Sequence, residues 1–200
     1  MVMPDQPTPH PERVLDAGAL RALAHPLRVR LYDILSQYGP QTASSLAELT
    51  GESTGSTSYH LRALARHDLI REVAGRGTAR ERWWERPAGM VTLTNPEMHN
   101  TPAGRAVMEA VQSETLTLRH QQLMHFANHG WAEAEEWRDA AIISTATARL
   151  TAEQSQDLVR RIHALVDETV ARYRDQTGEG VRPVTIRNDI FPLPTERGSA

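Results

Sequence analysis

The sequence contains no cysteine among its 200 residues, which excludes disulfides, thiolate metal ligands and a cysteine nucleophile. It also contains no lysine, so all 22 basic residues are arginines, each able to form two parallel hydrogen bonds to a phosphate or a guanine. No run of 18 apolar residues is present, and the N-terminus lacks the cationic start and apolar core of a signal peptide. We therefore expect a cytoplasmic protein with no membrane partner.

The charge of the chain is unevenly distributed. The formal net charge is −3, yet residues 53–86 contain seven arginines against four acidic residues. Residues 91–200 are acidic, with 11 arginines against 15 acidic residues. A locally basic segment inside an acidic protein indicates a module that binds a polyanion, attached to a region with another role.

Four helices are predicted before residue 67. His25-Pro26 separates the first two, since proline fits the first turn of a helix better than its interior. Thr42 and Ser53 are predicted N-caps of the other two, and Gly51 ends the shorter one. The predicted ranges are 11–24, 26 to Gly39, 43 to Gly51, and 54–66.

A β-hairpin is predicted after these helices, with strands over 69–74 and 80–84 and a turn at 75–77. The order of helix, helix, short helix, tight turn, helix and hairpin is that of a winged helix-turn-helix. At 100° per residue, Thr57, Leu61 and Leu64 share one face of the last helix and predict its buried side.

Several segments of the sequence resemble the ArsR-type family of bacterial transcriptional regulators, and together they span about residues 12–86. The resemblance implies a winged helix-turn-helix repressor that binds double-stranded DNA as a homodimer, although repression and activation both stay open. Metal-sensing relatives use cysteine pairs on the helix before the turn, and residues 43–48 contain none, so thiolate sensing is not implied. The matching segments are LRALAHPLR (20–28), SLAELTG (45–51), STSYHLRAL (56–64), LIRE (69–72) and RWW (82–84).

The outward face of the helix over 54–66 is small, polar and basic, which suits the major groove. The predicted wing tip carries Arg76 and Arg80, which we expect to contact phosphates or the minor groove. The alternative is that Arg62 and Arg66 are charged side chains that face solvent and contact no DNA. The full predicted DNA-binding set is Thr42, Ser53, Thr54, Gly55, Ser56, Ser58, Tyr59, Arg62, Arg66, Arg76, Thr78 and Arg80.

The second half of the chain predicts an α+β accessory domain. A long helix is expected over 102–129, and a second helix should begin at the capping box Thr151–Gln154. Strands are expected over 140–148 and 181–190, flanking that second helix. The expected role is dimerisation, small-molecule binding, or both, with the long helix and the first helix of the chain as candidates for the dimer seam.

Two further features of this half are weaker signals. His125 and His129 have a zinc-compatible spacing, but with nine histidines such pairs arise by chance, so no metal and no cofactor is predicted. Aromatic and methionine side chains between 124 and 137 could line an apolar pocket, although residues of this type more often belong to a core. No phosphate-binding loop, GxSxG elbow or metalloprotease motif is present, so no enzymatic activity is predicted.

The predicted fold is mainly α with small β elements. It comprises a disordered tail over 1–10, a winged helix-turn-helix over 11–90, and a C-terminal dimerisation or effector region over 91–200. The predicted function is that of a homodimeric transcription regulator on an inverted repeat, with the C-terminal region as the expected place for modulation by a small ligand. Two alternatives are a protein-interaction module that uses the winged fold without specific DNA binding and a His/carboxylate metal-responsive repressor.

Overall fold

The structure is a computed structural model that describes residues 13–78, 81–87, 91–92, 95–173 and 176–194. Contacts between residues divide it into a larger unit over residues 10–142 and a smaller one that contains residues 143–194. The predicted disordered tail over 1–10 lies outside the described residues. Each unit is described below by itself.

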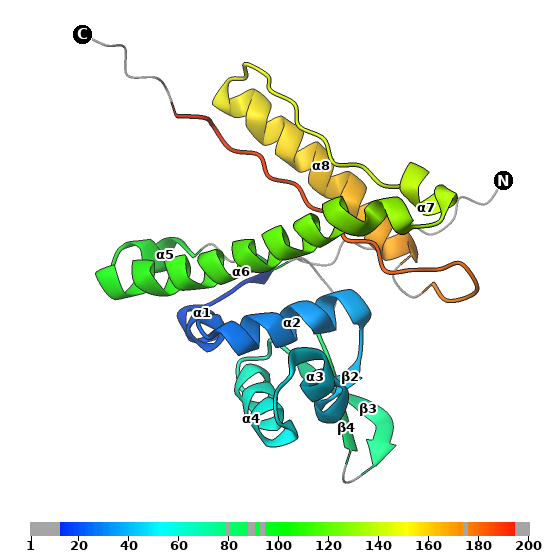
Figure 1. The fold of residues 1–200 in the computed structure, drawn as a ribbon. Helices are drawn as coiled ribbons and strands as arrows, with labels where there is room; N and C mark the ends of the chain where they lie inside the picture. The colour runs from blue at the N-terminus through cyan, green and yellow to red at the C-terminus, as the bar shows by residue number, and fades with distance from the viewer. Residues whose placement is uncertain (1–12, 79–80, 88–90, 93–94, 174–175, 195–200) are drawn as a thin grey trace, which may run out of the picture. The chain divides into compact units, whose positions relative to one another are not determined.

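The helices that begin at Pro26, Ala43 and Thr54 start where the sequence predicts, and Figure 1 shows them in order along the larger unit. Pro26 is the first residue of its helix, and Gly39 ends that helix with a φ of 72°. None of the helices in the described parts of the chain has both the length and the apolar character needed to cross a membrane. The helices are α1 (Ala17–Leu23), α2 (Pro26–Tyr38), α3 (Ala43–Thr50), α4 (Thr54–Ala65), α5 (Pro96–His99), α6 (Pro102–His129) and α7 (Glu135–Asp139), with a 3₁₀ turn over Gly130–Ala132.

The first helix is shorter than predicted, and the reason is local. The Asp16 side chain accepts a hydrogen bond from the backbone N–H of Ala19 at 2.7 Å, which starts α1 at Ala17. The preceding residues form β1 (Arg13–Val14), which pairs in parallel with β5 (Val91–Thr92). The prediction of a helix from residue 11 is therefore wrong for residues 13 to 16.

The wing is a three-stranded antiparallel sheet in the order β2–β4–β3. Its strands are β2 (Gln41–Thr42), β3 (Arg71–Thr78) and β4 (Glu81–Glu85). The predicted turn at 75–77 is wrong, because β3 continues through it to Thr78 with a register shift between Glu72 and Gly77. Two glycines with positive φ, Gly75 and Gly77, make this irregularity accessible within the strand.

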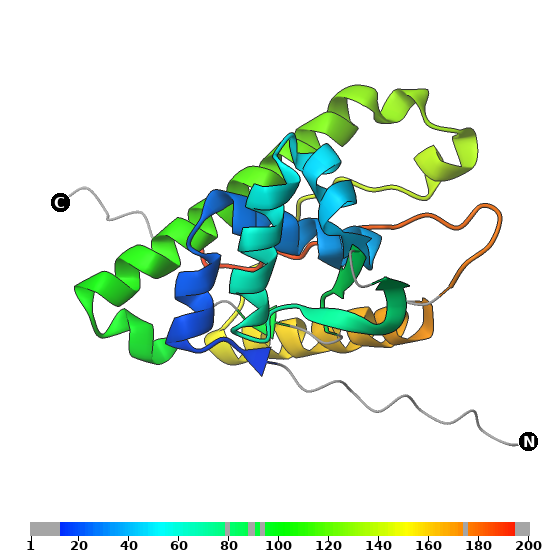
Figure 2. The same ribbon diagram turned by 90° about the horizontal axis from the view of Figure 1, so that it is seen from below.

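The core of the larger unit continues beyond the predicted division at residue 90. Leu20, Leu31 and Leu61 are fully buried at its centre, and Met108 and Val111 of α6 belong to the same cluster. α6 packs on α1 and α2, while α1 lies beside α4 (Figure 2). The domain boundary predicted at residue 90 stays a prediction. The start of α6, which lies beyond that boundary, packs into the same core as the helix-turn-helix.

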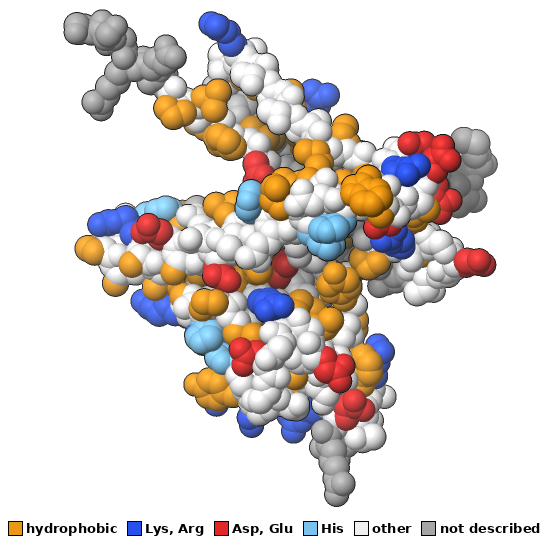
Figure 3. All heavy atoms as spheres, viewed as in Figure 1, with side chains coloured by type: hydrophobic (Ala, Val, Ile, Leu, Met, Phe, Trp, Pro, Cys, Tyr) orange, Lys and Arg blue, Asp and Glu red, His pale blue; other side chains and the backbone are white. Residues whose placement is uncertain are grey.

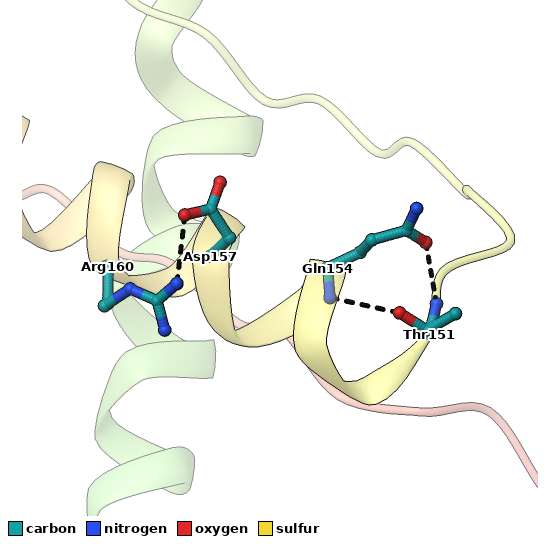
Figure 4. A network of polar contacts seen from close by, with 4 residues as sticks. All are labelled: Thr151, Gln154, Asp157 and Arg160. Atoms are coloured by element: carbon teal, nitrogen blue, oxygen red, sulfur yellow. Dashed lines mark hydrogen bonds and ion pairs between the residues drawn. The ribbon is translucent and has the colours of Figure 1, made fainter.

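The smaller unit contains one long helix, α8 (Ala152–Tyr173). As predicted, Thr151 and Gln154 form a capping box (Figure 4). The Gln154 side chain accepts a hydrogen bond from the Thr151 N–H at 2.9 Å, and the Thr151 hydroxyl accepts one from the Gln154 N–H at 3.2 Å. Arg160 also pairs with Asp157 at 3.0 Å one turn further along. None of the residues of α8 is buried.

The two strands predicted around α8 are wrong. Residues 141–150 and 181–194 carry no helix or strand, although their sequences favour an extended chain. A strand is stable only when a neighbour pairs with its backbone, and the described residues supply none for these segments. Apart from β5, all the helices and strands described in the predicted accessory region are therefore helices.

We expect Met108→Ala to lower the free energy of unfolding by about 2–5 kcal/mol, because Met108 is buried between α6 and the helix-turn-helix. Gln112→Ala, at an exposed position one turn further along α6, is the matched control and should change stability by less than about 0.5 kcal/mol. Urea unfolding followed by circular dichroism measures both. Equal effects of the two substitutions would contradict the packing of α6 on this core.

Candidate nucleic-acid interface

The tight turn between α3 and α4 is built from glycine and serine. Gly51 adopts the left-handed conformation that ends α3, with a φ of 74°. Ser53 then caps α4, its hydroxyl accepting from the Ser56 N–H at 3.1 Å. The turn and the cap are as predicted, and they fix the direction in which α4 leaves the core.

One face of α4 is buried and the opposite face is open to solvent. Thr57, Leu61 and Leu64 have no exposed surface, which confirms the predicted inner side. Tyr59 is 64% exposed, and Arg62 and Arg66 are exposed on the outer side. The Nε of Arg62 donates to the Ser58 carbonyl at 3.0 Å, which steadies the side chain along the helix and leaves its terminal nitrogens outward.

The N-terminal turn of α4 offers open backbone. Ser53, Thr54 and Gly55 are exposed, and Ser56 and Ser58 are half-buried beside them. A Cβ at Gly55 would meet nothing closer than the Ser53 hydroxyl at 4.0 Å, so the space in front of this turn is empty. An anion can approach the backbone N–H groups here without displacing a side chain.

Thr42 does not lie on this open face. Its side chain is 5% exposed, and its hydroxyl accepts from the Ser45 N–H at 3.1 Å in a capping box that starts α3. Its backbone pairs with Trp83 in the sheet. The structure therefore gives Thr42 a role in positioning α3, separate from the other predicted DNA-binding residues.

The wing presents a second basic surface. The Arg76 guanidinium lies 3.6 Å from the centre of the Trp83 ring, and stacking leaves its edge available for a phosphate. Thr78 is exposed at the end of β3, whereas Arg80 lies outside the described residues. Trp84, the other tryptophan of the pair, is buried in the core.

Beside α4 lies a group of cationic side chains that the sequence did not single out. The rings of His25 and His60 are 4.4 Å apart, and Arg28 lies with them where α2 meets α4. Burial lowers the pKa of His60, with the positive charges of His25 and Arg28 adding to the effect and Glu52 opposing it. Helical periodicity in the sequence shows on which face of α4 His60 lies, but it cannot show its neighbour on another helix.

The histidine pair and the aromatic and methionine side chains of the second half form no site of their own among the described residues. His125 and His129 stack at 4.6 Å, but the described residues hold no group of three or more side chains that could bind a metal together. Trp131 is 73% exposed and Met124 is 41% exposed, so these two side chains line neither a core nor an enclosed pocket.

A groove of about 600 Å³ lies instead between α2, the end of α3 and α6. Its apolar walls include Leu27, Ile34 and Leu118. Its polar walls include Asp33 and Gln122, whose side chains lie within hydrogen-bonding distance of each other at 3.3 Å. Because α3 is the first helix of the helix-turn-helix, a ligand in this groove would contact the element that positions α4.

Comparison with known protein families gives one match in this region. A family model described as a helix-turn-helix domain matches residues 23–73, about a quarter of the chain. No curated protein matches the chain. The match covers α2, α3, α4 and the start of β3, so the fold and the comparison agree on a helix-turn-helix domain, to which the structure adds a small antiparallel wing. A helix-turn-helix domain supports a DNA-binding regulator.

We expect Thr42→Ala to lower the free energy of unfolding by about 0.5–2 kcal/mol, because α3 loses its cap. Ser44→Ala, at an exposed position of the same helix, is the control and should change stability by less than about 0.5 kcal/mol. At a temperature where both variants are folded, DNA affinity should equal that of the parent protein. A loss of affinity in folded Thr42→Ala would place Thr42 among the DNA contacts after all.

Proposed function

We propose that this protein is a sequence-specific DNA-binding transcription regulator of the ArsR-like type that acts as a homodimer on an inverted-repeat operator. The observation that carries the proposal is the exposed polar and basic face of α4 in a helix-turn-helix that its caps and core hold rigid. In this reading α4 enters the major groove, where Tyr59 and Arg62 read base edges. Arg76 and Thr78 of the wing contact the neighbouring backbone.

The helix N-terminus complements these contacts. Thr54 and Gly55 offer backbone N–H groups to a phosphate at the mouth of the groove, and Ser53, Thr54 and Ser56 offer hydroxyls. Phosphate contacts of this kind set the register of the protein on the duplex and leave sequence readout to the middle of α4.

The proposed dimer explains the apolar surface that the long helix leaves exposed. Leu116, Leu123 and Met124 of α6 are each more than 40% exposed beyond the part of the helix that packs on the core. Leu116 and Leu123 are seven residues apart, the spacing at which two helices pack side by side. A two-fold dimer would place its two α4 helices in successive major grooves, with half-sites about 10 bp apart or a multiple of that.

We also propose that a small ligand tunes DNA binding through the groove between α2, α3 and α6. The groove combines apolar walls with Arg30, Asp33 and Glu114, a mixture that suits a small polar or charged organic molecule. A ligand that prefers one spacing of these helices shifts the population of the DNA-competent form. This proposal places the effector site at the junction with α6 and not in the segment after residue 142.

The first experiment is affinity selection of fragmented genomic DNA on the purified full-length protein at physiological salt. We expect enrichment of a two-fold symmetric motif, and we expect Arg62→Ala to lose it, because removal of a base contact costs roughly 1–3 kcal/mol of specific affinity. Arg161→Ala, an exposed helix arginine on α8, is the matched control and should retain the motif.

Selection that enriches no motif, or that enriches the same motif for the parent and for Arg62→Ala, would contradict the proposed readout by α4. A pull-down that recovered one protein partner in place of DNA would favour the interaction-module alternative. DNA binding is recognised by an affinity for duplex DNA that falls as the salt concentration rises, because the protein contacts phosphates.

Arg76→Ala should behave differently from Arg62→Ala. Because Arg76 is assigned to the phosphate backbone, its loss should weaken binding to all duplexes alike and flatten the dependence of log affinity on log salt by about one unit. Fluorescence anisotropy with the selected operator and a scrambled duplex, each over a salt series, measures both quantities. A sequence-dependent loss in Arg76→Ala would assign the wing to base readout instead.

A further inference from the structure

Three cationic or ionisable side chains meet where the start of α2 contacts the flank of α4. His25 precedes α2, Arg28 lies in its first turn and His60 lies in the middle of α4. The two imidazole rings are 4.4 Å apart with their planes at 43°, and the Tyr59 ring meets His60 edge-on at 5.1 Å. The cluster is therefore continuous with the exposed face of α4 through Tyr59. Figure 3 shows histidine side chains reaching the surface in this part of the molecule.

The polar atoms of this cluster have few partners within the protein. The Nδ1 atoms of His25 and His60 and the Nε of Arg28 are buried without a hydrogen bond to any described residue. The remaining ring nitrogens and the Nη atoms of Arg28 are not among these buried atoms, and all three residues are half-buried. Each of these residues therefore keeps some surface that solvent or a ligand can reach.

The electrostatics of the cluster favour an anion. The groups that act on His60 are His25 and Arg28 from α2 and Glu52 from the turn before α4, and Tyr59 acts on Arg28. Two ionisable groups near α1 are engaged elsewhere: Asp16 caps α1, and His67, which follows α4, lies against Gly18. Glu52 is thus a single carboxylate beside one permanent cation and two imidazoles.

We propose that His25, Arg28 and His60 form a binding site for a DNA backbone phosphate on the flank of α4, and that this contact is coupled to protonation of His60. The proposal rests on the proposed function, which brings α4 into the major groove and its flank toward the phosphates that border the groove. The outer nitrogens of the two rings and the fork of Arg28 supply the donors.

The sign of the coupling follows from the surroundings of His60. In the free protein, burial lowers the pKa of His60, and the electrostatic effects of His25 and Arg28 lower it further. A phosphate beside the ring favours the charged form and raises the pKa in the complex above its value in the free protein. DNA affinity should therefore rise as the pH falls through the range between the higher bound pKa and the lower free pKa, and level off below it.

The test measures the affinity of the full-length protein for a pool of random-sequence duplexes between about pH 8 and about pH 6 at constant ionic strength. Phosphate contacts are independent of sequence, so no operator is required. We expect the parent protein to bind several-fold to about tenfold more tightly at the acidic end, since one pKa unit corresponds to a factor of ten. The double variant His25→Gln/His60→Gln should show a flat profile.

The matched control is the double variant His125→Gln/His129→Gln. It removes the other stacked histidine pair, which lies on the exposed end of α6, and should keep the pH dependence of the parent. Arg28→Gln retains both histidines and should weaken binding at every pH while lowering the salt dependence by about one counterion. Circular dichroism confirms that each variant is folded before binding is measured.

A second measurement tests proton uptake directly. Calorimetry of the same duplexes in buffers with different ionisation enthalpies should show uptake of protons by the parent and by the control pair, and none by His25→Gln/His60→Gln. Folded cluster variants that match the parent in pH profile, salt dependence and proton uptake would overturn the phosphate site while leaving DNA binding intact. Failure of the parent itself to bind any duplex would instead overturn the proposed function.

Discussion

The burial of one face of α4 is the constraint on which the rest of the molecule depends. Thr57, Leu61 and Leu64 pack without exposed surface against the core built by α1, α2 and α3. Because a helix is rigid, fixing this face also fixes the opposite one, so the backbone of α4 directs Tyr59 and Arg62 outward. A polar face that is already ordered loses less side-chain entropy on binding than a flexible one.

The same packing links the outer elements to α4. β4 places Trp84 in the core, and with it positions Trp83 under the Arg76 guanidinium. On the other side, Met108 and Val111 anchor the start of α6 to the core, while the remainder of that helix leaves apolar residues exposed. The wing and the proposed effector groove therefore meet the core that orients α4. The helix α6 joins the proposed dimer surface to the same core.

The residues around α4 divide the proposed DNA contacts by physical type. The first turn offers backbone N–H groups, the outer face offers Tyr59 and Arg62, and the flank offers the outer nitrogens of His25, Arg28 and His60. An arginine keeps its charge at every physiological pH, whereas a histidine pair does not. Near neutral pH, histidine is the cationic side chain whose charge responds to pH. This chain places two histidines beside α4, the candidate recognition helix.

Local signals in the sequence were sufficient for α2, α3, α4, α6 and α8. The caps at Thr42, Ser53 and Thr151, the proline at the start of α2 and the buried stripe of α4 all act within one or two turns of chain. Tertiary structure decided whatever depends on a partner distant in the sequence. Extended segments near 140–148 and 181–190 found no strand to pair with, Thr42 was buried because β2 joins β4, and β3 ran through two glycines that resembled a turn. The meeting of His25 with His60 is of the same kind, because only the packing of α2 on α4 brings residues 35 positions apart into contact.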